Sequence, residues 1–284
     1  MAVIRKAIPE DFAKALPLFE KFNNGNLSRD NWQTLFQDNW NSGEGYIGYV
    51  LVDGEHIGGF IALLFSKRTM NGKEEKFCNV SSWVVEDRYR NQSLFLLTPV
   101  LKLKDYTITI LTCSLETYKV ACKLGFTDLE THIQIIPPVP GIGALIKKCK
   151  IEINNDTQSG TLTGESQRLW RDHERFGLLK INIHTSKGDC LILATRIIRK
   201  NLPFIQVHHT NNISVFIEFA GRISASLCLS LKAVSVLMDR RWLAGRAPIV
   251  SLSWPLPHPR VFKSTTLSAK DIDSLYSELP ILNI

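Results

Sequence analysis

Two short turns organise the first half of the chain. Tyr46–Val52 and Ile57–Ser66 are rich in apolar and β-branched residues, and Asp53-Gly54 lies between them. An Asp-Gly pair between two such segments is the strongest short-range signal of a β-hairpin. Asn71-Gly72 is a second turn of this kind and leads to the segment Lys76–Val85. The sequence therefore predicts three consecutive strands joined by tight turns.

Helical and strand patterns surround these three strands. Ala2–Lys6 reads as a strand, and helical spacing of apolar residues follows in Phe12–Phe19 and Trp32–Phe36. After the third strand the patterns alternate between helix and strand, in the order Ser93–Leu103, Thr107–Cys113, Glu116–Leu124 and His132–Ile136. This order predicts an α/β domain with a mixed sheet over residues 1–137.

The second half repeats part of this order. Strands are predicted at Leu179–His184, Cys190–Arg199 and Phe204–His209, followed by an apolar helix at Ser214–Leu231 and a strand at Val234–Asp239. A proline-rich stretch at residues 137–141 separates the halves. We therefore predict a tandem arrangement: a linker over 138–160, and a second α/β domain over 161–284 that is a degenerate copy of the first.

Composition limits the class of protein. Residues 1–137 carry 15 Lys and Arg against 16 Asp and Glu, whereas residues 138–284 carry 19 against 11. The basic second half would suit an anionic partner. No apolar run in the sequence reaches the length of a membrane span, and no export signal is visible. The six cysteines are scattered without metal-ligand spacing. We expect a cytoplasmic protein without a metal site.

A polar turn follows the strand that ends at Val84-Val85 and precedes a helix. Together with the order of elements, it resembles the GNAT superfamily of acyl-CoA N-acyltransferases, whose turn reads Arg/Gln-x-x-Gly-x-Gly/Ala. Arg90 fits this pattern, Ser93 is a small substitute for the first glycine, and Phe95 replaces the second. Free N–H groups and the dipole at a helix start can hold a pyrophosphate. The resemblance implies an acyl-CoA site made by Val84, Val85, Arg90, Asn91, Gln92, Ser93, Leu94, Phe95 and Ser114.

A second segment carries the same resemblance. Residues Ser114, Thr117, Ala121 and Lys123–Phe126 are similar to the family pattern Asn-x-x-Ala-x-x-x-Tyr-x-x-x-Gly-Phe. Ser114 is expected to hydrogen-bond a pantetheine amide in place of the asparagine. Ala121 stands where the family often has a tyrosine that protonates the departing thiolate. Tyr118 lies about one helical turn earlier and is an alternative donor.

Residues for catalysis are few. Family members often carry a carboxylate on the strand before the turn, but here that strand offers only Asn79, Ser81 and Ser82. Glu130 and His132, near the last strand of the first half, are therefore predicted as catalytic residues that reach the acceptor directly or through water. The alternative for both is an ordinary surface residue.

Three functions stay open at this point. The first is an acyl-CoA-dependent acyltransferase, with acetyl-CoA or another acyl-CoA as co-substrate and an amine or hydroxyl of a small molecule or sugar as acceptor. The second is a catalytically inactive GNAT-like scaffold or acyl-CoA sensor, which the changes at Phe95 and Ala121 would allow. The third, a nucleic-acid-associated protein, is less favoured because no recognition element is visible.

Overall fold

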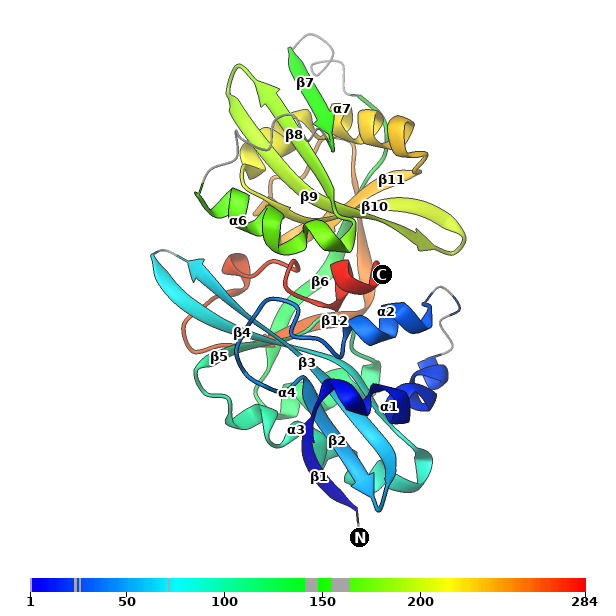
Figure 1. The fold of residues 1–284 in the computed structure, drawn as a ribbon. Coiled ribbons are helices and arrows are strands. Elements are labelled where there is room, and N and C mark those ends of the chain that lie inside the picture. The colour runs from blue at the N-terminus through cyan, green and yellow to red at the C-terminus, as the bar shows by residue number, and fades with distance from the viewer. Residues whose placement is uncertain (1, 23–24, 26, 71, 141–147, 155–163) are drawn as a thin grey trace. The chain divides into compact units, whose positions relative to one another are not determined.

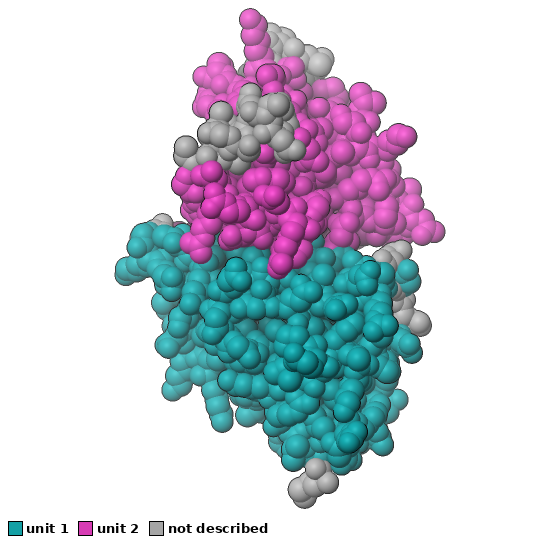
Figure 2. All heavy atoms as spheres, in the orientation of Figure 1, with its two compact units in different colours: residues 1–127, 260–268, 276–282 teal, residues 128–259, 269–275, 283–284 magenta. Residues whose placement is uncertain are grey.

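The chain divides into two compact units, each made of segments that are far apart in sequence. The computed structural model describes residues 2–22, 25, 27–70, 72–140, 148–154 and 164–284. Unit 1 comprises residues 1–127, 260–268 and 276–282 (Figure 2). Unit 2 comprises residues 128–259, 269–275 and 283–284.

Unit 1 is built on a mixed sheet. Its strands lie in the order β1 (Val3–Ala7), β2 (Gly48–Asp53), β3 (His56–Met70), β4 (Lys73–Val85) and β5 (Tyr106–Ile110) (Figure 1). The pairs β1–β2, β2–β3 and β3–β4 are antiparallel, whereas the pair β4–β5 is parallel. Asp53 pairs with His56 and Met70 with Lys73 across the two predicted turns, so the three joined strands are confirmed. Gly54 has a φ of 62°, which a glycine adopts without strain.

Helices cover both faces of this sheet. They are α1 (Phe12–Phe19), α2 (Arg29–Thr34), α3 (Ser93–Leu97) and α4 (Leu115–Lys123). On one face, Phe19 and Phe36 contact the ring of Phe60 in β3. The next residue of β3, Ile61, points to the other face because side chains alternate along a strand. There it packs in a core cluster with Leu96 of α3.

Unit 2 repeats the architecture of unit 1. Its elements follow in the order β7 (Cys149–Ile153), α6 (Gly164–His173), β8 (Leu179–Thr185), β9 (Gly188–Arg199), β10 (Leu202–Thr210), α7 (Ile213–Leu231) and β11 (Ser235–Asp239). In the sheet, β7, β8, β9 and β10 are antiparallel neighbours, and β10 and β11 are parallel. These strands have the order and directions of β1 to β5. The predicted second α/β domain is present, and its origin as a degenerate copy of the first stays a prediction.

Short helical turns complete the described chain. They are the 3-10 helices Pro9–Asp11, Glu20–Phe22, Asp87–Gln92, Val100–Lys102, Glu174–Phe176, Arg240–Leu243 and Ala269–Asp271, and the α-helix α8 (Glu278–Leu282). The Arg240–Leu243 turn follows β11, where unit 1 has the longer helix α4 after β5. The second copy is therefore reduced at this point.

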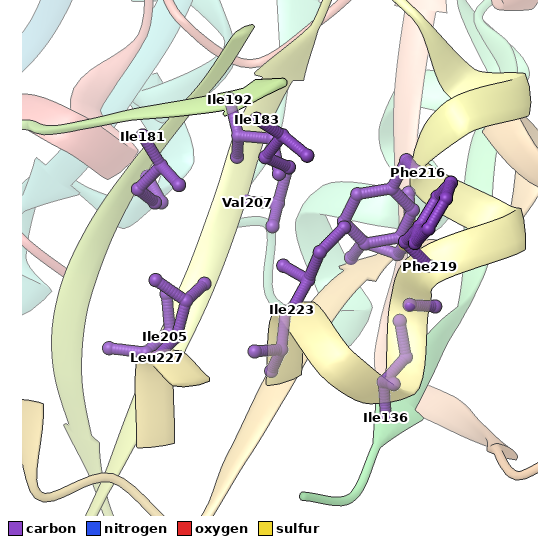
Figure 3. Close-up of a cluster of buried hydrophobic side chains, with 14 of the residues drawn as sticks. Ile136, Ile181, Ile183, Ile192, Ile205, Val207, Phe216, Phe219, Ile223 and Leu227 are labelled. Atoms are coloured by element: carbon purple, nitrogen blue, oxygen red, sulfur yellow. The ribbon is translucent and has the colours of Figure 1, made fainter. Parts of the chain in front are cut away.

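Helix α7 forms the core of unit 2 with the sheet. Figure 3 shows its apolar side chains together with those of the strands, among them Phe216, Phe219, Ile223, Ile183 and Val207. By length and composition alone, α7 could cross a membrane. Eight of its residues are buried, however, which explains its apolar sequence as that of a core helix.

The last strand of each copy completes the sheet of the other unit. β6 (Thr127–Ile136) follows the first copy in sequence, yet Ile133–Ile136 pair antiparallel with β11 in unit 2. β12 (Leu252–Lys263) follows the second copy, yet Val261–Lys263 pair antiparallel with β5 in unit 1. The two copies have thus exchanged their final strands.

This exchange bears on the predicted division of the chain. The compact units divide at residue 127 and include distant segments, whereas domains were expected at 1–137 and 161–284. β7 lies inside the predicted linker 138–160, where its apolar residues pair with β8. Residues 141–147 and 155–163 of that segment lie outside the described residues. The predicted domain boundaries at 1–137 and 161–284 stay predictions.

Cutting the chain after residue 137 tests the exchange. The fragment 1–137 lacks the strand that covers β5, so its open sheet edge should leave it unstable or self-associated. We expect size-exclusion chromatography and circular dichroism to show aggregates or incomplete folding, with the full chain as the control. A monomeric fragment with cooperative thermal unfolding would contradict this expectation.

Candidate functional site

The parallel strands β4 and β5 separate before they end. Their pairing runs from Lys76 and Tyr106 to Asn79 and Thr109, whereas β4 continues to Val85. In the described pairing, the later part of β4 has β3 as its neighbour on one side and no strand on the other. Ligands of α/β proteins bind beyond the carboxyl ends of such strands. This divergence is therefore the candidate functional site of unit 1.

A β-bulge reinforces the divergence. Phe60 pairs with Val84 and Ala62 with Ser81, so two residues of β4 lie opposite Ile61 alone. Ser82, in the bulge, has a φ of 47°, which is uncommon for a residue with a side chain. Bulges bend a strand and redirect its side chains, and they occur often beside active sites.

The turn after β4 packs tightly on β3. The Tyr89 ring is buried, and its hydroxyl donates a hydrogen bond of 2.9 Å to Asp53. A Cβ at Gly58 would lie 2.1 Å from the Tyr89 ring, and one at Gly59 would lie 2.7 Å from the side chain of Val85. Two consecutive glycines in β3 thus allow the turn to approach the strand.

The predicted acyl-CoA residues lie along this turn. Val84 and Val85, at the end of β4, are half-buried. Gln92 and Ser93 in the turn are also half-buried, whereas Asn91 is exposed. Leu94 and Phe95 are 51% and 58% exposed. Arg90 is exposed, and its guanidinium lies 3.2 Å from Asp87. Trp83 donates from its indole nitrogen to the carbonyl of Ser93, at 3.2 Å, and links the strand end to α3.

The helix after the turn is shorter than the predicted Ser93–Leu103. A 3-10 helix precedes α3, and the Ser93 N–H already donates to the Arg90 carbonyl. α3 ends at Leu97, two residues before Pro99, which has no N–H to continue the helix. Fewer free N–H groups are therefore available than a regular helix start would offer.

The remaining predicted residues have defined structural roles. The hydroxyl of Ser114 caps α4 by accepting from the Thr117 N–H at 3.2 Å. Glu130 lies in unit 2, where its carboxylate accepts from the N–H groups of Thr131, His132 and Arg241 at 2.8, 2.9 and 2.8 Å. The His132 ring contacts the Thr131 hydroxyl at 2.9 Å. Their roles in binding and catalysis stay predictions.

The sequence interpretation missed a carboxylate at the divergence. Glu278, the first residue of α8, is 0% exposed, and the Thr112 hydroxyl donates to its Oε1 at 2.6 Å. The backbone N–H of Glu278 donates to Asn79 Oδ1 at 3.4 Å. Asn79 in turn donates to Thr109 Oγ1 at 3.0 Å. Since Asn79 and Thr109 form the last parallel pair, these contacts put Glu278 where β4 and β5 part.

The electrostatics of Glu278 follow from its surroundings. Burial raises the pKa of its carboxyl, against the lowering effects of the Thr112 hydrogen bond and the Arg260 charge. Cys113, which follows Thr112, has a pKa raised to about 11, mainly by burial. Cys113 therefore stays a thiol at neutral pH and is a poor nucleophile.

Unit 2 has the corresponding divergence, occupied by its own chain. The parallel pairing of β10 and β11 runs from Phe204 and Ser235 to Gln206 and Leu237. The pairing of β10 with β9 then shifts register, which leaves His208 as the extra residue. His208 is 0% exposed, and its ring contacts Thr195 Oγ1 at 2.9 Å and Ser274 Oγ at 3.1 Å. The corresponding place in unit 1 holds the buried carboxylate of Glu278, and this divergence is the candidate site.

No protein-family model matches this sequence, and no curated protein matches it. Solved structures do match. A GCN5-related N-acetyltransferase from Anabaena variabilis ATCC 29413 is 12% identical, covers 93% of this chain and 72% of its own, and has a TM-score of 0.59. One from Kribbella flavida is 12% identical over 95% of this chain and 72% of its own, with a TM-score of 0.57.

This chain has the GNAT fold. A third similar structure, a GCN5-related glucosamine N-acetyltransferase region of a fungal multi-domain GH3 beta-N-acetylglucosaminidase, has a TM-score of 0.59 at 10% identity and covers 93% of this chain and 38% of that one. The predicted fold class is confirmed. The likeness to GNAT structures extends well beyond residues 1–137, where the sequence resemblance lay.

Metal ligands are not grouped in the described part of the chain. Among residues 2–22, 25, 27–70, 72–140, 148–154 and 164–284, no cluster of three or more His, Cys, Asp or Glu could hold an ion.

The close packing of the turn predicts the effect of Gly58→Ala. The added methyl group would displace the Tyr89 ring and its bond to Asp53, so we expect the free energy of unfolding to fall by roughly 1–3 kcal/mol. Thermal or denaturant unfolding measures this change. Gly25→Ala is the control, because its Cβ would meet nothing within 4 Å. Equal stability of the two variants would contradict the packing described.

Proposed function

We propose that the chain is an acyl-CoA-dependent acyltransferase whose unit 1 binds the acyl-CoA. The observation that carries this proposal is the end of the β4–β5 pairing at Asn79 and Thr109, with a buried carboxylate beside it and the turn to α3 beyond it. The GNAT fold of the chain is in accord with this proposal.

The free side of β4 suits an extended, amide-containing ligand. From Val80 to Val85 the strand has no β5 partner in the described pairing. A pantetheine arm carries two amides and can bond to such an edge as an additional strand would. The pyrophosphate would then lie toward Arg90 and the turn, where Arg90 would exchange Asp87 for phosphate oxygens.

The reaction is the transfer of an acyl group, with acetyl as the simplest case, to an amine or hydroxyl of a small molecule or sugar. The lone pair of the acceptor attacks the thioester carbonyl, and the C–S bond breaks as the new bond forms. One similar structure is named a glucosamine N-acetyltransferase region, which makes an amino sugar a reasonable first probe. The basic second half of the sequence favours an anionic acceptor.

The state of the cysteines bears on the cellular compartment. The six cysteines are free thiols, of which Cys78, Cys190 and Cys228 are buried. Free buried cysteines are ordinary in a reducing compartment. We propose the cytoplasm as the location.

An acyl-CoA sensor without turnover is the second candidate, and a specific observation favours it. Ala121, at the position of the family tyrosine, is buried in the core cluster, and Tyr118 packs against the same cluster. Ala121 has no hydroxyl to donate a proton, and the Tyr118 side chain is half-buried. A sensor would bind acyl-CoA and release no thiol.

Calorimetry with acetyl-CoA and CoA tests binding, and release of free thiol tests transfer. We expect both ligands to bind, and Ser93→Trp to weaken the affinity at least about tenfold, because the turn must approach the phosphates closely. Ser230→Trp, at an exposed position of α7, is the control. Binding of neither ligand would overturn the proposal. Binding without thiol release would favour the sensor.

A further inference from the structure

We propose that Glu278 is the proton acceptor of the acyl transfer. This inference rests on the proposed function. Its carboxylate would take the proton from the attacking amine at the point where β4 and β5 part. α8, which carries it, is about two hundred residues from Asn79 in sequence. No motif on the strand before the turn provides this group.

The two carboxylate oxygens of Glu278 have different environments. Oε1 accepts from the Thr112 hydroxyl at 2.6 Å, which holds the side chain in place. Oε2 is buried and has no hydrogen-bond partner among the described residues. An ionisable oxygen without a partner costs free energy in a protein interior, and a site that binds a polar ligand is one setting in which such a group is kept.

The backbone of Glu278 also makes a hydrogen bond at the divergence, at 3.4 Å. Its N–H contacts Asn79 of β4, and its side chain contacts Thr112, two residues after the end of β5. α8 buries all its residues from Glu278 to Leu282. A thioester lying along the free side of β4 beyond Asn79 would therefore be close to this carboxylate.

The charged and titratable neighbours of Glu278 are few. Arg260 of β12 and Cys113 after β5 interact with it electrostatically, and Asn79 and Thr112 are neutral. Arg260 is itself 4% exposed. A carboxylate in this setting is a stronger base than one at the surface, since burial raises its pKa while Arg260 keeps the ionised form accessible.

The step balances without any further reactant. The amine nitrogen forms a bond to the thioester carbon and passes its proton to Oε2 of Glu278. The C–S bond then breaks with its electron pair on sulfur, and the proton moves from Glu278 to this thiolate. The products are the amide and free CoA thiol, and Glu278 returns to its carboxylate form.

Other candidates for this role are less suitable. Both carboxylate oxygens of Glu130 accept backbone N–H groups. Cys113 has its pKa raised to about 11, mainly by burial. Thr112 is a positioning residue here, because it acts by holding Glu278.

Glu278→Gln tests the role directly, because glutamine keeps the size of the side chain and can still accept from Thr112. With acetyl-CoA as donor and glucosamine and a panel of primary amines as acceptor probes, we expect kcat to fall about 100-fold or more. The affinity for acetyl-CoA should stay within about twofold. In the wild type the rate should rise with pH as the Glu278 carboxyl loses its proton. In Glu278→Gln this rise should be absent. Glu55→Gln, whose side chain is 97% exposed, is the control.

Two outcomes separate the failure of this inference from that of the proposed function. If the wild type transfers acyl groups and Glu278→Gln does so equally, Glu278 is not the proton acceptor and the acyltransferase stands. If the wild type binds no acetyl-CoA, or binds it and releases no thiol with any probe at any pH, the transferase fails and the role of Glu278 with it.

A second measurement needs no acceptor. The raised pKa means that the folded state holds this proton more tightly than the unfolded state, so its stabilising effect is present at low pH and lost as pH rises through the folded pKa. Glu278→Gln does not ionise. The difference in Tm between variant and wild type should therefore grow in favour of Glu278→Gln as the pH rises. A constant difference would overturn the environment on which the inference depends.

Thr112→Val distinguishes positioning from a purely structural role. Loss of the hydroxyl removes a hydrogen bond that favours the carboxylate, so the pH dependence of the rate should move to higher pH. A lower rate with an unchanged pH profile would contradict this linkage between Thr112 and Glu278.

Discussion

The short parallel pairing of β4 with β5 is the constraint on which the candidate site depends. Hydrogen bonds join the strands only as far as Asn79 and Thr109, and a bulge at Ser82 bends β4 beyond that point. Everything assigned to the site is arranged around this end: the turn held against Gly58, the indole of Trp83, and the carboxylate of Glu278. A longer pairing would close the edge of β4 with backbone hydrogen bonds and leave no room for a ligand there.

Local chemistry made much of the fold predictable. Asp-Gly and Asn-Gly turns restrict the connection of neighbouring strands, so the three strands after Tyr46 could be read from sequence. The strands of the second copy could be read from their runs of apolar and β-branched residues. The helix after β4 was predicted too long, because its apolar spacing continued past Pro99 whereas backbone hydrogen bonding could not. β7 was missed as a strand because it is short, with five residues, and a polar segment follows it directly.

The candidate site was predictable only in part. The turn from Val85 to Phe95 follows directly from neighbours in sequence, and its location at the end of β4 agrees with that reading. Glu278 could not be found this way, since its contacts are with Asn79 and Thr112, far away along the chain. Nothing in the residues around position 278 indicates burial of a carboxylate; that burial arises from tertiary packing. The exchange of β6 and β12 is hidden from sequence for the same reason.

The exchanged strands also have a consequence for the order in which the protein can be made. β5 emerges from the ribosome early, but the strand that covers its edge, Val261–Lys263, is synthesised some 150 residues later. At a typical elongation rate this delay is on the order of ten seconds, much longer than the formation of local turns and helices. During that time the nascent first copy has an unpaired edge, which is a site for wrong strand pairing. Efficient production of this chain therefore depends on conditions that protect an incomplete sheet until its last strand arrives.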